Sequence, residues 1–144
     1  MRIALAADHG GVDLKADLAN RLRAAGHDVT DLGTDGSTSV DYPDFAHAVT
    51  GAVLAGDVDR GMLVCGTGQG MAMSANKVHG IRAGVCSDPF SARMIAEHNN
   101  AQVLCLGARV LGTELAWAVA SAFVGATFEG GRHQRRVDKM ESDS

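Results

Sequence analysis

Residues 61–70 read GMLVCGTGQG, and this segment decides the fold class. Its first five residues form an apolar run that predicts a buried β-strand, and a glycine-rich turn follows it. From Thr67 toward Val78 the pattern favours a helix. Glycines let backbone N–H groups crowd around an oxyanion, and a helix N-terminus adds partial positive charge. Because Cys65 lies where strand meets turn, the same field favours its thiolate, and the segment predicts chemistry on a small anionic molecule.

The composition of the 144-residue chain indicates one α/β domain. Hydrophobic residues make up 46% of the sequence and aromatic residues 4%, so small aliphatic side chains must build the core. The net charge of −4 argues against the sequence-independent binding of nucleic acid that a basic surface provides. No apolar run approaches the ~20 residues of a membrane span, and the chain enters a strand at once, without a signal peptide. We therefore expect a cytoplasmic protein without nucleic-acid or membrane partners.

The three cysteines do not have the spacing of a metal site. Cys65, Cys86 and Cys105 form no Cys-x-x-Cys pair and no zinc-type pattern. All three lie in or at the end of apolar segments, so reduced and buried thiols are expected. We predict no metal and no other cofactor.

Five apolar runs alternate with helical patterns, which predicts right-handed crossovers and a parallel sheet. The expected strands are residues 3–7, 27–32, 62–65, 81–86 and 102–106. The expected helices carry inward faces at Leu14, Leu18 and Leu22, at Phe45, Val49, Ala52 and Val53, at Met71, Ala75 and Val78, along residues 89–98, and at Leu115, Val119 and Phe123. We expect a doubly wound, Rossmann-like domain over residues 1–127, with strand order 2-1-3-4-5 and helices on both faces. Residues 128–144 lose the pattern and predict a tail that is frayed or docked on a neighbouring subunit.

Polar residues follow the first and third expected strands. Asp8 and His9 come directly after residues 3–7, and Cys65 ends the third strand. Doubly wound sheets bind ligands beyond the carboxyl ends of their strands, at the point where the strand order reverses. In the expected order this point lies between strands 1 and 3, so the two turns should converge on one pocket.

Eight short blocks are spread along the chain from about residue 2 to residue 137. They are Asp8-His9-Gly10, Asp41-Tyr42-Pro43, Cys65-Gly-Thr67-Gly-x-Gly70, Ala75-Asn76-Lys77, Gly80-Ile-Arg82, His98-Asn99, Gly107-x-Arg109 and Gly130-Gly-Arg132-His133-Gln-x-Arg136. Together they strongly resemble the type B ribose-5-phosphate isomerases, a family that includes isomerases of galactose, allose and tetrulose phosphates. Some relatives replace the thiol and place a glutamate just after the loop, whereas Cys65 is present here and Met71 follows Gly70, which implies the cysteine branch.

The resemblance implies an aldose–ketose isomerase that acts on a sugar phosphate, first of all on ribose 5-phosphate to give ribulose 5-phosphate. Such a reaction moves a proton between adjacent carbons through a cis-enediolate and needs a base and oxyanion donors. Cys65 is the implied base, although its position alone is equally compatible with packing. Thr67 is expected to orient the ligand, or to cap the helix. The expected main-chain donors belong to Gly66, Thr67, Gly68, Gln69 and Gly70.

The resemblance also assigns ring opening to His98, while the spacing alone favours a histidine that stabilises a helix C-terminus. Asn99, Asp8 and Tyr42 are expected to contact sugar hydroxyls or the ring oxygen. The expected phosphate ligands are His9, Arg109, Arg132 and Arg136.

The two C-terminal arginines lie in a basic run that could also be a solvated tail, and Arg135 lies outside the family pattern. Arg132 and Arg136 are four residues apart, so a helical turn would place them on one face. In the family, part of the phosphate site comes from a neighbouring subunit. We therefore expect a homodimer, or a tetramer, with sites shared between subunits.

Two alternatives remain from the sequence. The same chemistry could act on a hexose 6-phosphate or a tetrulose 4-phosphate, and Gln69 stands where relatives often carry an apolar residue. A non-catalytic nucleotide-binding sensor could use the same fold. Against the sensor, the first turn reads Asp-His-Gly-Gly and lacks the dinucleotide fingerprint Gly-x-Gly-x-x-Gly.

Overall fold

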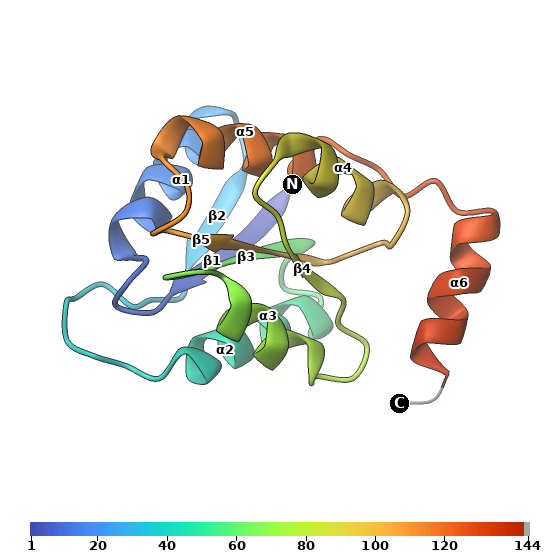
Figure 1. Ribbon diagram of the computed structural model, residues 1–144, viewed down its shortest axis with the longest axis horizontal. Coiled ribbons are helices and arrows are strands. Elements are labelled where there is room, and N and C mark those ends of the chain that lie inside the picture. Colours follow the sequence, from blue (N-terminus) through green and yellow to red (C-terminus); the bar gives the residue numbers. More distant parts are fainter. Residues whose placement is uncertain (143–144) are drawn as a thin grey trace.

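Every strand of the sheet is parallel to its neighbours, as the alternation of strands and helices predicts. The computed structural model describes residues 1–142 and places all five strands in one sheet (Figure 1). The strands are β1 (Arg2–Ala7), β2 (Asp28–Asp31), β3 (Arg60–Cys65), β4 (Ala83–Val85) and β5 (Val103–Gly107). The predicted doubly wound fold class is confirmed.

The strand order is β2-β1-β3-β5-β4, so the predicted order 2-1-3-4-5 is wrong for the last two strands. All five residues of β5 are buried, whereas the three residues of β4 are half-buried. A central strand needs apolar side chains on both faces along its length, and the segment Ala83–Val85 is too short and too small to supply them. The strand order still reverses between β1 and β3, so the expected position of the ligand crevice is unchanged.

Helices cover both faces of the sheet (Figure 1). On one face α1 (Val12–Ala24), α4 (Pro89–Glu97) and α5 (Thr113–Val124) pack on Ile3, Leu5 and Leu104, and on the other face α2 (Tyr42–Leu54) and α3 (Gln69–Asn76) pack on Ala4, Ala6 and Leu63. The core consists mainly of small aliphatic side chains, as the composition indicates.

One predicted core residue of α5 lies on the wrong face. Leu115 is 44% exposed, and Ala116 takes its expected place in the core together with Val119 and Phe123.

Within residues 1–142, no helix combines the length and apolar content that a membrane crossing requires.

The C-terminal segment forms a helix, α6 (Arg132–Glu141), where the sequence predicted an unpatterned tail. His133 and Val137 are its buried residues, so only one narrow stripe of the helix contacts the domain. The guanidinium of Arg82 donates to a carboxylate oxygen of Glu141 at 2.8 Å and to the carbonyl of Asn100 at 2.9 Å, which ties the end of α6 to the loop after α4. Residues 143 and 144 of the predicted tail lie outside the described residues. Docking of this segment on a neighbouring subunit stays a prediction.

Arg60 fastens the end of α5 to the sheet, which gives a test of the packing. Its guanidinium donates to the carbonyls of Phe123 and Ala126, the latter at 2.7 Å, and lies 5.0 Å from the centre of the Phe123 ring. Burial lowers the pKa of Arg60, but an arginine stays charged. Arg60→Ala removes both donors, so we expect the free energy of unfolding in urea to fall by about 2 kcal/mol.

The matched control for this experiment is Arg93→Ala. Arg93 is 53% exposed and lies 3.8 Å from the Glu97 carboxylate, so its loss should cost less than about 0.5 kcal/mol. Equal losses for the two variants would show that Arg60 does not fasten α5.

Candidate active site

Cys65 is the last residue of β3, and its sulfur lies inside the turn that leads into α3. The backbone N–H of Gly68 donates to Cys65 Sγ at 3.1 Å, and Cys65 is only 5% exposed. Gly68 has a φ of +82°, a left-handed conformation that folds its N–H back toward the sulfur and that side chains disfavour. The turn therefore supplies a main-chain donor to negative charge on this thiol.

The other two cysteines lie in a different environment. Burial raises the pKa of the Cys86 thiol to about 11 and also raises that of Cys105. Both are free thiols inside the core, as predicted, and they stay protonated at neutral pH. Of the three, Cys65 is the cysteine placed for chemistry.

The turn after β3 packs directly against the end of β5. Gly107 stands opposite Cys65 in the ladder, and a Cβ atom there would lie 2.8 Å from the backbone of Thr67, so only glycine fits. The N–H of Ala108 donates to the Cys65 carbonyl at 2.8 Å, and the N–H of Arg109 donates to the Gly66 carbonyl at 3.0 Å. These contacts place Arg109 beside the turn.

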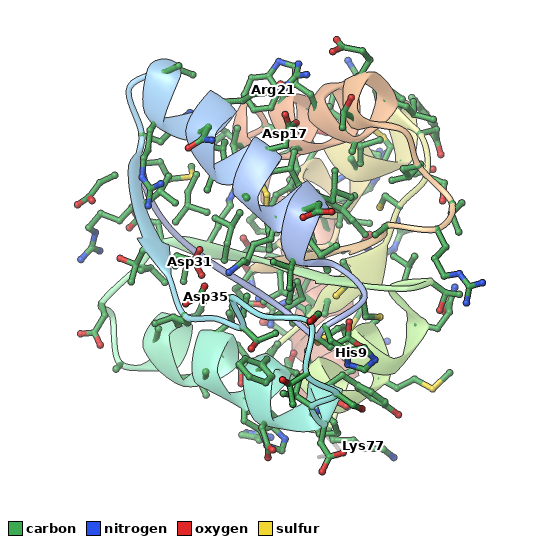
Figure 2. The ribbon with its side chains drawn as sticks, turned by 90° about the vertical axis from the view of Figure 1, so that its left-hand side faces the viewer. His9, Asp17, Arg21, Asp31, Asp35 and Lys77 are labelled. Atoms are coloured by element: carbon green, nitrogen blue, oxygen red, sulfur yellow. The ribbon has the colours of Figure 1, made fainter. Side chains whose placement is uncertain are left out.

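The residues after β1 lie next to the same turn. The N–H of Asp8 donates to the Val64 carbonyl at 3.1 Å, and the Asp8 carboxylate accepts the N–H of Gly10 at 2.9 Å. His9 is exposed at this edge of the sheet (Figure 2). Its Nδ1 accepts the N–H of Val40 at 3.2 Å, so the hydrogen of the neutral ring is on Nε2, which is the donor available to a ligand.

A buried lysine holds the loop that carries Val40. Lys15 is 1% exposed, and its Nζ donates to Asp31 at 2.6 Å, to the carbonyl of Thr34 at 2.8 Å and to Asp35 at 3.3 Å. Asp31 and Asp35 lie side by side next to α1 (Figure 2). Three acceptors satisfy the three donors of the ammonium group, which offsets its burial. Sequence reasoning missed Lys15, although its position between Leu14 and Leu18 on α1 is a signal of an inward direction.

Two further predicted residues complete this edge. The ring of Tyr42, the first residue of α2, packs so closely on Gly70 that a Cβ atom at Gly70 would lie 2.6 Å from it. The hydroxyl of Thr67 accepts the N–H of Gln69 at 3.3 Å, at the start of α3. The structure therefore brings together one group of predicted residues: Asp8, His9, Tyr42, Gly66, Thr67, Gly68, Gln69, Gly70, Cys65 and Arg109.

A second group of predicted residues lies at the opposite edge of the sheet. His98 follows α4 directly, and this helix runs antiparallel to the strands, so its C-terminus lies at their amino ends. Asn99 follows His98, and α6 with Arg132 and Arg136 lies beside them, at the far side of the molecule from the loop between β2 and α2 (Figure 1). A strand of five or six residues spans about 17–20 Å, so the two groups do not meet within one chain.

His98 lies in a small cluster of side chains at that edge. Its Nε2 lies 3.1 Å from a carboxylate oxygen of Glu129, and its ring stacks on His133 with centroids 4.1 Å apart and planes 10° apart. The sequence had assigned no role to Glu129 or His133.

These three side chains are also a candidate for a metal site, because their ligand atoms lie within 4.8 Å of one another. A metal ion must lie in the plane of each histidine ring that ligates it, where the nitrogen lone pair points. The near-parallel stacked planes of His98 and His133 do not share such a point, so this arrangement does not fit one ion bound by both rings.

Comparisons with known proteins identify the family. The family described as Ribose/Galactose Isomerase matches residues 3–140. Ribose-5-phosphate isomerase B of Escherichia coli is 48% identical over 139 residues, 96% of this chain and 93% of the relative. D-erythrulose-4-phosphate isomerase of Pectobacterium atrosepticum is 44% identical over 142 residues, 97% of this chain and 93% of the relative.

A solved structure agrees with these relatives. Ribose-5-phosphate isomerase B of Clostridium thermocellum superposes with a TM-score of 0.97 at 48% identity, over 99% of this chain and 96% of that chain. The fold, the carboxyl-edge site and the matches together show that the chain belongs to the ribose/galactose isomerase family and is an aldose–ketose isomerase.

Proposed function

We propose that this isomerase interconverts ribose 5-phosphate and ribulose 5-phosphate through a cis-enediolate, with Cys65 as the base and without a metal. The observation that carries the proposal is the hydrogen bond from the Gly68 N–H to Cys65 Sγ, at the switch point of the sheet. The relatives support a phosphorylated sugar, because one is named for ribose 5-phosphate and another for erythrulose 4-phosphate.

In the proposed chemical step, the Cys65 thiolate removes the proton from C2 of the open-chain aldose. The C2 electron pair forms the C1–C2 double bond, and the carbonyl oxygen at C1 becomes the oxyanion. The proton of the C2 hydroxyl passes to the C1 oxygen, which leaves the negative charge on the C2 oxygen. That oxygen then forms the C2 carbonyl while the electron pair of the C1–C2 double bond takes the proton from the Cys65 sulfur at C1, which gives the ketose and restores the thiolate. Backbone N–H groups of residues 66–70 and the Thr67 hydroxyl are the donors that stabilise the oxyanion, a contribution that is often among the largest in such sites.

The proposed phosphate site needs a second copy of the chain. His9 and Arg109 lie at the carboxyl edge with Cys65, whereas Arg132 and Arg136 are exposed on α6 at the amino edge. A phosphate dianion needs several cations to offset its lost hydration. We therefore infer a homodimer in which α6, His98 and Asn99 of one copy complete the site around Cys65 of the other.

The length of the sugar is tested by kinetics on phosphates of four, five and six carbons. We expect kcat/KM for ribose 5-phosphate to exceed that for erythrulose 4-phosphate, allose 6-phosphate and galactose 6-phosphate by about tenfold or more. Because one relative is named for erythrulose 4-phosphate, this tetrulose phosphate is the second candidate substrate. If kcat/KM is higher for it than for ribose 5-phosphate, it takes the place of ribose 5-phosphate in the proposal.

The cytoplasmic location stays a prediction.

Alkylation distinguishes Cys65 from the core thiols. With iodoacetamide at about pH 8, we expect Cys65 to react first and isomerase activity to fall in proportion, because burial raises the pKa of Cys86 to about 11 and keeps its thiol protonated. Mass spectrometry of the peptides, with residual activity, measures both. Cys65→Ser, labelled in parallel, should lack the fast-reacting thiol. Full activity after complete labelling of Cys65 would rule it out as the base.

Complementation tests the shared site. Cys65→Ser and His98→Asn should each be inactive, but a heterodimer of the two variants holds one intact site of two. Co-expression with two different tags and tandem purification should therefore recover about half of the wild-type turnover. A heterodimer of Cys65→Ser with Cys65→Ala is the matched control and should stay inactive. An inactive heterodimer of Cys65→Ser with His98→Asn would show that the sites are not shared between the two chains.

A further inference from the structure

Glu129 and His133 are two side chains that the proposed mechanism does not use, and both contact His98. We propose that Glu129 is a positioning residue that holds His98, with His133 as a stacking surface, in the one orientation that opens the sugar ring. This inference rests on the proposed function, in which His98 acts on a cyclic aldose phosphate.

The backbone around Glu129 fixes the place of its carboxylate. The N–H of Glu129 donates to the carbonyl of Glu97 at 3.0 Å, which docks residue 129 on the last turn of α4. Gly130 and Gly131 follow with φ values of +69° and +57°, and α6 begins at Arg132. This turn brings the chain back, so that the carboxylate and the His133 ring approach His98 from one loop and its following helix.

The contact with Glu129 determines which nitrogen of His98 carries the hydrogen and which keeps a lone pair that can accept a proton. A carboxylate 3.1 Å from Nε2 is an acceptor, so Nε2 carries a hydrogen and Nδ1 keeps the lone pair of the neutral ring. Ring opening needs such a lone pair: Nδ1 takes the proton of the C1 hydroxyl, and the bond between C1 and the ring oxygen breaks with its electrons on that oxygen. The ring oxygen then takes the proton back from Nδ1, and Glu129 balances the imidazolium charge in between.

His133 supports the ring without competing for the proton. It is 9% exposed, and its ring lies nearly parallel to that of His98. Burial lowers the pKa of His133, the charges of His98, Arg132 and Arg136 act in the same direction, and only Glu129 opposes them. His133 is therefore neutral at neutral pH, while the other nearby carboxylate, Glu97, faces Arg93 at 3.8 Å.

The experiment compares a reaction that needs ring opening with one that does not. Ribose 5-phosphate is mostly a closed ring, whereas ribulose 5-phosphate cannot form a furanose because its C5 hydroxyl is esterified. Glu129→Gln should lower kcat/KM for ribose 5-phosphate by about 10- to 100-fold, since the amide keeps the size but not the charge. The rate at which deuterium from D2O enters ribulose 5-phosphate depends on Cys65 chemistry and should stay within about twofold of wild type.

The matched control is Glu97→Gln, a carboxylate on the same turn that faces Arg93, and it should leave both rates unchanged. An equal loss of both rates in Glu129→Gln, or no loss of either, would overturn the positioning role. So would a loss of wild-type activity in EDTA that Zn²⁺ restores, because the cluster would then be a metal site. If wild type does not isomerise ribose 5-phosphate at all, the proposed function itself fails, which is a distinct result.

Discussion

Direct contact between two backbones, the turn after β3 and the end of β5, is the constraint on which the carboxyl-edge site depends. A side chain at Gly107 would collide with the backbone of Thr67 at 2.8 Å. Because the turn is confined, the N–H of Gly68 is held in its hydrogen bond to the sulfur of Cys65. The same packing places Arg109 beside the turn, where its N–H donates to the Gly66 carbonyl. The geometry around the thiol is therefore set by close packing of main-chain atoms.

The alternation of strands and helices explains why the predicted residues divide into two groups. A helix that follows a parallel strand returns the chain to the amino edge, so a residue at its C-terminus, such as His98, lies a strand length from Cys65. Residues at the start of a helix, such as Tyr42, lie at the carboxyl edge. In the proposed dimer, each chain therefore contributes its His98 to the site around Cys65 of the other chain.

The fold class and the convergence of the turns after β1 and β3 could be predicted from local signals, whereas Tyr42 and Arg109 were expected only from the family resemblance. Buried strands are apolar runs, and a glycine turn after a strand marks the switch point. The order of β4 and β5 depends on which strand is long enough for a central place. The apolar run at residues 81–86 predicts a strand of six residues, whereas β4 has only three. The helix α6 was missed because His133 and Val137 are too few for a visible periodicity. Glu129 acts through a contact across the fold, which no spacing in the sequence reports.

The two outermost strands of the sheet, β2 and β4, are poorly suited to pairing with a strand of another chain. β2 begins and ends with aspartates and is largely exposed, while β4 has only three residues. Short or charged borders are poor templates for the addition of a foreign strand, so they protect a parallel sheet from fibrillar stacking during folding. In the proposed dimer, the contacts between copies would therefore be made by helices and loops, the surfaces on which α6 presents its arginines.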